Sequence, residues 1–301
     1  MTAQRVHILK VPSYEEKALE KVLSFFSDTF DVFGKKILLK PNWVSFRQAE
    51  LSCTHPMILR VLSRAFLDAG AQVLIGDSPA FGTSFQVFKA SQAKNLLSDL
   101  PVKVVKFSPG PSFTLPCGVK VRLAREIFEV DAVINVPRLK AHNQLLLTLA
   151  VKNLFGCVVG LQKPFLHARI GHLDDLFPEM LLEIAEAVPV SWNVLDAIVA
   201  MERKGPIGGA PCPLGLLLVS EDAVALDTVV YTAMKLSPEE VPLWRVARKK
   251  KHPGAFIENI TFDFLPALQS FLLPPKLAPI TFHPLRLLKG LMKRGFWRLF
   301  G

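Results

Sequence analysis

Residues 56–79, PMILRVLSRAFLDAGAQVLIGDSP, contain the pattern that decides the fold class. The first part carries apolar side chains at helical spacing, with Thr54 as its expected N-cap and Gly70 just past its end. The second part, residues 72–75, is a short apolar run that stops before the polar Asp77, which indicates a buried strand. A helix followed closely by a buried strand is the repeating unit of α/β proteins.

The same alternation extends through most of the chain. The expected strands are residues 6–9, 36–39, 72–75, 102–107, 132–136, 193–198 and 214–219. The expected helices are residues 15–26, 56–69, 144–155, 174–188 and 223–236. Asn143 is the expected cap of the third helix and Asp222 of the last. This order predicts an α/β fold with a mostly parallel central sheet flanked by helices.

Composition narrows the class of protein. Half of the 301 residues are hydrophobic and the mean hydropathy is +0.32, yet no apolar run reaches the roughly 20 residues that span a bilayer. The N-terminal residues lack the apolar segment of a secretory signal. The four cysteines lie far apart and form no C-x-x-C pair. These features predict a reduced, cytoplasmic setting without a disulfide framework.

The net charge of +10 is concentrated at one end of the chain. From Arg245 onward there are eleven of the 36 Lys and Arg residues but only two of the 26 acids, so the preceding body is nearly neutral. We therefore expect an α/β domain over residues 1–240 and a basic, Pro-interrupted extension over residues 241–301. Nucleic acid is not the expected partner, because the basic segments lack interleaved aromatic platforms.

Polar side chains gather where the expected strands end. They are Lys40, Asn42, His55, Asp77, Lys140 and His142. In open α/β sheets the carboxyl ends of parallel strands meet at one edge, where ligands bind. Cations at that edge suit a small anionic molecule, such as a carboxylate or phosphate. Each residue alone has a structural alternative, as a solvated lysine, a capping histidine or a turn aspartate. Their common edge is what indicates a site.

A second polar group follows the helix expected at residues 144–155. Lys152 and Asn153 end that apolar helix, where the negative end of the helix dipole by itself would favour a cation. Lys163 and His167 follow in an expected loop rich in glycine and aromatics. We expect these four residues to bind the ligand together with Lys40, Asn42 and His55.

The chemistry expected of the site is proton transfer. His142 is the natural acid or base because its unperturbed pKa lies near 6.5, with Asp77 or Asp196 as its partner and Lys140 as a further catalytic residue. A metal site would use His142, His167 and His172. The last two are five residues apart and would diverge by about 140° on a helix, so they would need a loop. No H-E-x-x-H pattern supports it.

Seven sequence blocks follow one another over residues 36–230: KPNWV (40–44), THP (54–56), AGAQVLIGDSP (69–79), INVPRLKAH (134–142), VKNLFGCVVG (151–160), LDAIVAMERKGPIGG (195–209) and SEDAVALD (220–227). In this order they resemble the domain-of-unknown-function 362 family. The resemblance assigns no general activity. Many members of the family carry a ferredoxin-type module with cysteine runs that hold iron–sulfur clusters. This sequence has no such run, so no cluster of that kind is expected, and the cofactor stays open.

The tail is a separate question. Residues 284–300, PLRLLKGLMKRGFWRLF, form a basic, acid-free amphipathic pattern typical of a segment at a membrane surface. A helix docked on the body with its cations exposed is the equal alternative. Two functions follow: an enzyme that binds a small anionic metabolite, or a non-catalytic binding or scaffold protein held peripherally at the inner face of an anionic membrane by its tail.

Overall fold

A ten-stranded sheet forms the centre of the protein, whose computed structural model describes residues 4–277 apart from 24, 26–30, 161 and 174. Its strands are β1 (Gln4–Lys10), β2 (Lys36–Pro41), β3 (Gln72–Asp77), β4 (Lys103–Lys106), β7 (Ala132–Val136), β8 (Arg138–His142), β9 (Leu146–Thr148), β10 (Val190–Glu202), β11 (Ala210–Ser220) and β12 (Ile260–Phe262). The order is β12-β1-β11-β10-β7-β2-β3-β4, with β8 paired to β10 and β9 paired to β8.

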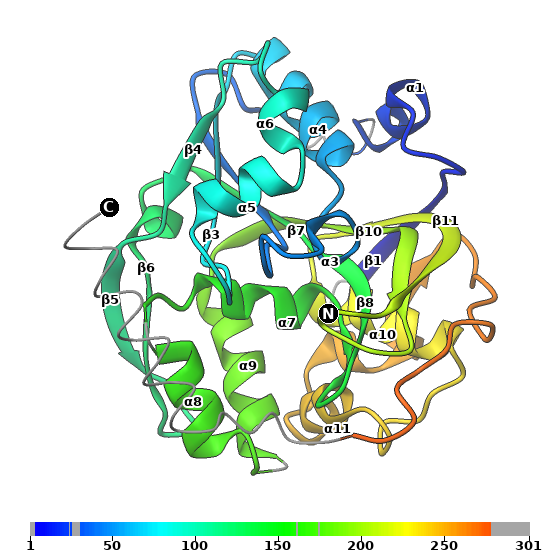
Figure 1. Cartoon of the computed structure of the whole chain (residues 1–301). Helices are drawn as coiled ribbons and strands as arrows, with labels where there is room; N and C mark the ends of the chain where they lie inside the picture. The colour runs from blue at the N-terminus through cyan, green and yellow to red at the C-terminus, as the bar shows by residue number, and fades with distance from the viewer. Residues whose placement is uncertain (1–3, 24, 26–30, 161, 174, 278–301) are drawn as a thin grey trace.

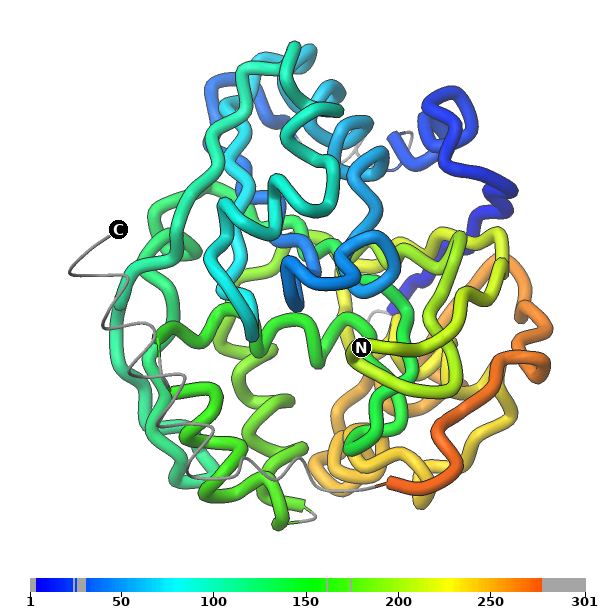
Figure 2. Tube along the Cα trace, viewed as in Figure 1, coloured from blue at the N-terminus to red at the C-terminus, as the bar shows by residue number. Residues whose placement is uncertain are grey.

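Most neighbouring strands are parallel. The run β10-β7-β2-β3-β4 is parallel throughout, whereas β11 is antiparallel to both of its neighbours and β9 is antiparallel to β8. The expectation of an α/β fold with a mostly parallel sheet is confirmed. Figure 2 shows that the first strand and the late segments lie side by side, because β1 pairs with β11 and β12.

Helices cover both faces of the sheet (Figure 1). One face packs against α1 (Glu16–Leu19), η1 (Glu20–Leu23), α3 (Ala49–Ser52), α4 (Pro56–Asp68), α5 (Ser84–Ala90) and α6 (Ala93–Leu96). The other packs against α7 (Ala150–Leu154), η3 (Phe155–Cys157), α8 (Gln162–Ile170), α9 (Leu176–Ala187), α10 (Ala223–Ala233) and α11 (Pro242–Lys249). Alternation along β2 serves both faces: Ile37 and Leu39 join the first core, and Leu38 joins the second.

The chain between β7 and β8 explains how a strand end becomes a site. Pro137 has no N–H to donate, so the ladder is interrupted there, while its carbonyl accepts from Asp196 N at 2.9 Å. The chain then resumes as β8 beside the second half of β10, with Asp196 opposite Arg138 and Met201 opposite Lys140. Lys140 and His142, which follow the expected strand at residues 132–136, are therefore held on a second strand.

Three local expectations were wrong: the helix at residues 144–155, its cap at Asn143 and the cap of α4 at Thr54. The N-cap of α7 is Leu149, and Asn143 Oδ1 instead accepts from Gly205 N at 3.2 Å. The segment 144–155 is not one helix: β9 comes first, and α7 begins only at Ala150. A short buried apolar run has no periodicity that separates strand from helix, and β9 pairs with β8 through contacts that are not local in sequence. The N-cap of α4 is His55, whose Nδ1 accepts from Met57 N at 3.3 Å. Thr54 instead accepts from Asn42 N at 2.7 Å and donates to Val136 O at 2.6 Å.

Other elements were not expected from the sequence. They are the hairpin of β5 (Pro109–Thr114) and β6 (Lys120–Ala124), the short helix η2 (Arg125–Phe128), α3, α5, α6, α8, α11, η4 (Pro253–Ala255), η5 (Ile257–Asn259) and β12. By contrast, Asp222 caps α10 as expected, accepting from Ala225 N at 2.8 Å.

The chain beyond residue 240 also packs on the body. Trp244, Leu268 and Phe271 are buried in the second core, and β12 extends the sheet beside β1. The division at residue 240 stays a prediction. The tail expectation at residues 284–300 lies outside the described residues. Among the helices that the structure describes, none has the length and apolar character to cross a membrane.

Candidate functional site

An ion pair joins the ends of β2 and β3. Lys40 Nζ lies 3.0 Å from Asp77 Oδ1 and donates to Pro41 O at 3.0 Å. The other carboxylate oxygen of Asp77 accepts from Trp43 N at 2.8 Å. Both charged side chains are almost fully buried, and Gly156 closes over them: a Cβ there would lie 2.2 Å from Asp77 Oδ1. The ends of these two strands therefore lie together as predicted, and the two side chains form a buried ion pair.

Lys140 begins a series of hydrogen-bonded asparagine side chains that runs across neighbouring strands. Its ammonium donates to Asn42 Oδ1 and, at 2.6 Å, to Ser52 O. From Asn42 the hydrogen bonds continue through three further asparagines at 2.6, 2.8 and 2.8 Å, in the order Asn153, Asn135, Asn193. Burial lowers the pKa of Lys140 to about 7. A fully satisfied buried network of this kind fixes the positions of its members.

Lys152 lies in a different environment. Its ammonium is 4.6 Å from the ring centroid of Phe155 and 6.0 Å from that of Phe177. His167, on α8, packs against the same two rings, at centroid distances of 5.5 and 4.7 Å. Burial of the ammonium, followed by the charges of Lys163 and other lysines, lowers the pKa of Lys152 to about 7. Unlike Lys40 and Lys140, the residue keeps some solvent exposure.

His142 is a neutral histidine held by the backbone. Its Nδ1 accepts from Gln144 N at 3.2 Å and from Leu145 N at 3.1 Å, so its proton is on Nε2. Burial, then the charge of Lys152, lowers its pKa well below 6.5. Burial and the charge of Lys152 likewise lower the pKa of His167 to about 3. Both rings are electrostatic neighbours of Lys152, which makes them neutral polar groups beside a lysine.

The remaining candidates from the same stretch are placed differently. Lys163, near the start of α8, donates to Ser78 O and so joins the loop after β3 to the Lys152 region. His172 is exposed, whereas His142 is buried. In the described ranges no three His, Cys, Asp or Glu side chains are gathered as a metal ion would require.

A second polar cluster lies at the other end of β8. The Asp196 carboxylate accepts from Tyr14 OH at 2.8 Å and from His55 N at 3.1 Å, and lies 3.7 Å from Arg138 Nε. The rings of Tyr14 and His55 stack at 3.5 Å. Burial lowers the pKa of His55 to about 4 and, followed by the Asp196 charge, raises the pKa of Tyr14. Asp196 and His55 therefore belong with Arg138, not with His142 and Lys152.

Sequence reasoning missed several members of these clusters. They are Tyr14, Asn135, Arg138 as an ion-pair partner, Phe155, Gly156, Phe177 and Asn193. Asn135 offered a signal, since it is a polar residue within the otherwise apolar AVINV strand. Tyr14 and Phe177 offered no such signal. The hydrogen-bond partner of Tyr14, Asp196, is 182 residues away, and Phe177 contacts Lys152 from another helix.

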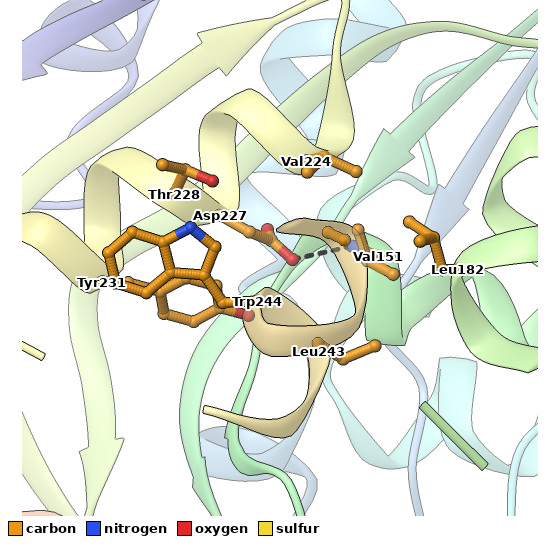
Figure 3. A pocket seen from close by; sticks show the side chains of 9 residues that line it. Val151, Leu182, Val224, Asp227, Thr228, Tyr231, Leu243 and Trp244 are labelled. Carbon is orange, nitrogen blue, oxygen red and sulfur yellow. Dashed lines mark hydrogen bonds between the residues drawn. The ribbon is translucent and has the colours of Figure 1, made fainter. Parts of the chain in front are cut away.

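Cavities occur elsewhere in the described structure. One, of about 10 Å³, lies under α10 and α11, and Figure 3 shows Asp227 beside it with a hydrogen bond to Val151. That volume is at the lower limit for one water molecule, so it is a packing defect. Asp227 accepts from Ala150 N and Val151 N at 2.8 and 3.1 Å and thereby starts α7, although burial raises its pKa well above the usual range.

The fold and these clusters define a class: an α/β protein with a lysine-rich polar centre at the carboxyl ends of parallel strands. The chain belongs to the family described as "Domain of unknown function (DUF362)", whose model matches residues 37–232. A relative in Synechocystis sp., named a thylakoid-associated protein, is 33% identical over 305 residues, covering 97% of this chain and 95% of the relative.

Two solved structures overlap with part of the fold. The lactate racemase apoprotein from Thermoanaerobacterium thermosaccharolyticum aligns over 67% of this chain and 52% of its own, with 12% identity and a TM-score of 0.42. A Thermotoga maritima protein aligns over 69% of this chain and 56% of its own, with the same identity and score. The chain thus spans about half the length of these structures, and similarity at this level says nothing of its activity.

Proposed function

We propose that the protein is an enzyme that binds a small anionic metabolite, a carboxylate or phosphate, at the lysine-rich centre. The observation that carries this proposal is an excess of positive charge. Lys40, Lys140 and Lys152 influence one another electrostatically, but among the residues that the structure describes only Asp77 pairs with one of them. In the described part of the chain, neither Lys140 nor Lys152 has a carboxylate within ion-pair distance.

An anion would complete this arrangement. Bringing several ammonium groups out of water is costly unless an opposite charge accompanies them, and the lowered pKa values of Lys140 and Lys152 express that cost. A bound carboxylate or phosphate would favour the charged lysines and draw protons onto them. Lys152 and Lys163 are the lysines of this region that keep solvent exposure, so they are the expected first contacts.

Proton transfer would then fall to groups that titrate near neutrality. Lys152, with a pKa of about 7, can act as acid or base at physiological pH. His142, a neutral donor through Nε2, would orient the ligand, since protonating it is unfavourable at that depth. Asp77 and Asp196 would hold Lys40 and Arg138 in place.

Calorimetric titration with inorganic phosphate and with α-hydroxybutyrate tests this proposal. Wild-type protein is expected to bind at least one of them. Lys152→Met is expected to weaken this binding at least about tenfold, a loss of about 1.4 kcal/mol in binding free energy. Lys89→Met, which changes an exposed lysine on α5, is the matched control and should bind normally. Absence of binding by the wild type, or equal binding by all three proteins, contradicts the proposal.

A second candidate is a non-catalytic binding or scaffold protein held at a membrane surface by its basic tail. The name of the Synechocystis relative, a thylakoid-associated protein alike over nearly the whole chain, is the observation that favours it. Flotation with anionic vesicles, using the full chain and a chain ending at residue 283, tests it. Loss of flotation on truncation supports membrane binding by the tail. A full chain that stays in the vesicle-free bottom fraction rejects it. Either candidate would operate in the cytoplasm, the second at the inner face of a membrane.

A further inference from the structure

Lys152 differs from the other buried lysines in what its amine contacts. Lys40 pairs with Asp77 and donates to Pro41 O, and Lys140 donates to Asn42 Oδ1 and Ser52 O. Within the residues that the structure describes, Lys152 has no hydrogen-bond acceptor, and its recorded contacts are the faces of Phe155 and Phe177. Its amine is therefore the one of the three that is not committed to holding the fold together.

The surroundings of Lys152 are those that activate a lysine as a nucleophile. Aromatic walls remove water from the amine, and Lys163, Lys140 and Lys40 are positively charged neighbours. Desolvation and an adjacent cation are the two general means by which proteins make a lysine amine reactive at neutral pH. The lowered pKa of Lys152, about 7, agrees with this geometry. Of the three lysines, Lys152 alone is not fully buried as a residue.

Resting on the anion-binding function proposed above, we propose that Lys152 forms an imine with the carbonyl carbon of a small α-keto acid. The amine nitrogen bonds to the carbonyl carbon, and the C=O π electrons move to oxygen. After two proton transfers that oxygen leaves as water, and the C=N bond of the imine forms. No oxidant or reductant is required, and water is the only by-product.

The neighbours of Lys152 match the rest of such a substrate. Lys163 lies near the start of α8 and donates to the Ser78 carbonyl, where it can also bind a carboxylate adjacent to the carbonyl carbon. His142 and His167 are neutral electrostatic neighbours of Lys152, and His142 can donate a hydrogen bond through Nε2 to the substrate oxygen. The two protons that leave with this oxygen come from the Lys152 amine itself. An α-keto acid is the smallest class that presents both a carboxylate and an electrophilic carbonyl.

Trapping with sodium cyanoborohydride tests the imine in the full-length protein. The protein is incubated with α-ketobutyrate at neutral pH, and the reduced adduct is located by intact-mass measurement and peptide mapping. Labelling at Lys152 is expected to be at least about tenfold faster than at exposed Lys89. Lys152→Arg keeps the charge and should lose the label, while Lys89→Arg should keep it. Labelling that is even across exposed lysines, or fastest at Lys140, overturns the proposal.

The parallel titration with α-hydroxybutyrate separates the two proposals, since it has the same carboxylate but no carbonyl. Binding of this hydroxy acid without any adduct from the keto acid overturns the imine and leaves the anion-binding function standing. Failure of both hydroxy acid and phosphate to bind overturns the anion-binding function itself. The wild-type peptide map decides the labelled residue even where Lys152→Arg does not fold.

Discussion

The two ends of strand β8 hold two buried polar clusters that differ in charge balance: one pairs its cation with a carboxylate, and the other has more lysines than carboxylates. At one end, the guanidinium of Arg138 makes hydrogen bonds to Val199 O, Glu50 O, Cys53 O and Tyr14 OH, and it faces the Asp196 carboxylate. At the other end lie Lys140, on β8, and Lys152, on α7, and in the described part of the chain neither has a carboxylate of its own, because Asp77 pairs with Lys40. The strand β8 thus carries one cation that a carboxylate neutralises, Arg138, and one that none does, Lys140.

The contrast shows how structural and functional polar groups can be told apart. A buried charge that is matched by a partner and by hydrogen bonds stabilises one arrangement of the chain and leaves nothing for a ligand. Buried cations in excess of anions destabilise the empty protein and are relieved by an anion from outside. We therefore propose that the Arg138 cluster serves the fold and that the Lys152 region serves the function.

Arg138→Met gives the largest expected effect. It leaves the Asp196 carboxylate buried without its cation, which costs about 3–5 kcal/mol. Urea unfolding monitored by circular dichroism measures this against Arg125→Met, which alters an exposed arginine and should change stability by less than about 0.5 kcal/mol. Equal stability of the two variants would mean that the Arg138 cluster is not what holds this end of β8.

The free energy of unfolding should depend on pH because of the buried lysines Lys140 and Lys152. Lys140 and Lys152 have pKa values of about 7 in the folded protein, against 10.5 for an ordinary lysine, because burial disfavours their charge. Between those values the unfolded chain binds more protons, so the free energy of unfolding rises with pH by a few kcal/mol. The double variant Lys140→Met and Lys152→Met should show a smaller rise. Urea titrations below, within and above this window measure it, and parallel curves would refute it.

Gly156→Ala should lower the stability of the protein, because it crowds the buried Lys40–Asp77 ion pair next to the Lys152 region. The new methyl group would lie 2.2 Å from Asp77 Oδ1 and 2.6 Å from Lys40 Nζ, so the pair must move. The expected loss is about 1–3 kcal/mol. Gly118→Ala, where no atom lies within 4 Å, is the control for glycine removal and should cost about 1 kcal/mol from its positive φ. Thermal melts of both variants suffice, and a smaller loss at Gly156 would contradict the packing.

His55→Ala is the smallest expected effect. It removes the N-cap of α4 and the stack on Tyr14 but no net charge, since burial holds the pKa of His55 near 4. The expected cost is about 1 kcal/mol, without any change in phosphate binding. His55→Asn, which retains a capping side chain, should recover part of the loss. A variant that loses phosphate binding instead would move His55 into the functional cluster.

Much of the fold could be predicted because its signals are local. The strands at residues 36–39, 72–75 and 132–136 and the α4 helix follow from apolar runs, and Asp222 from a capping position. Strand-end logic also brought Lys40 and Asp77 together correctly. The expected partnership of Asp196 with His142 failed, because Asp196 lies within the long strand β10 opposite Arg138. The helix expected at residues 144–155 failed because pairing with β8 overrides the helical pattern there.

The sequence by itself determined the α/β class, the family and which edge of the sheet carries the polar residues, because apolar periodicity and residue type are readable one segment at a time. Only the tertiary structure decided which cations are neutralised. That depends on contacts such as Asp196 with Arg138, or the rings of Phe155 and Phe177 with Lys152, and on the burial that makes each contact strong. Charge balance in a folded protein is a property of neighbours in space, and the chain order does not specify it.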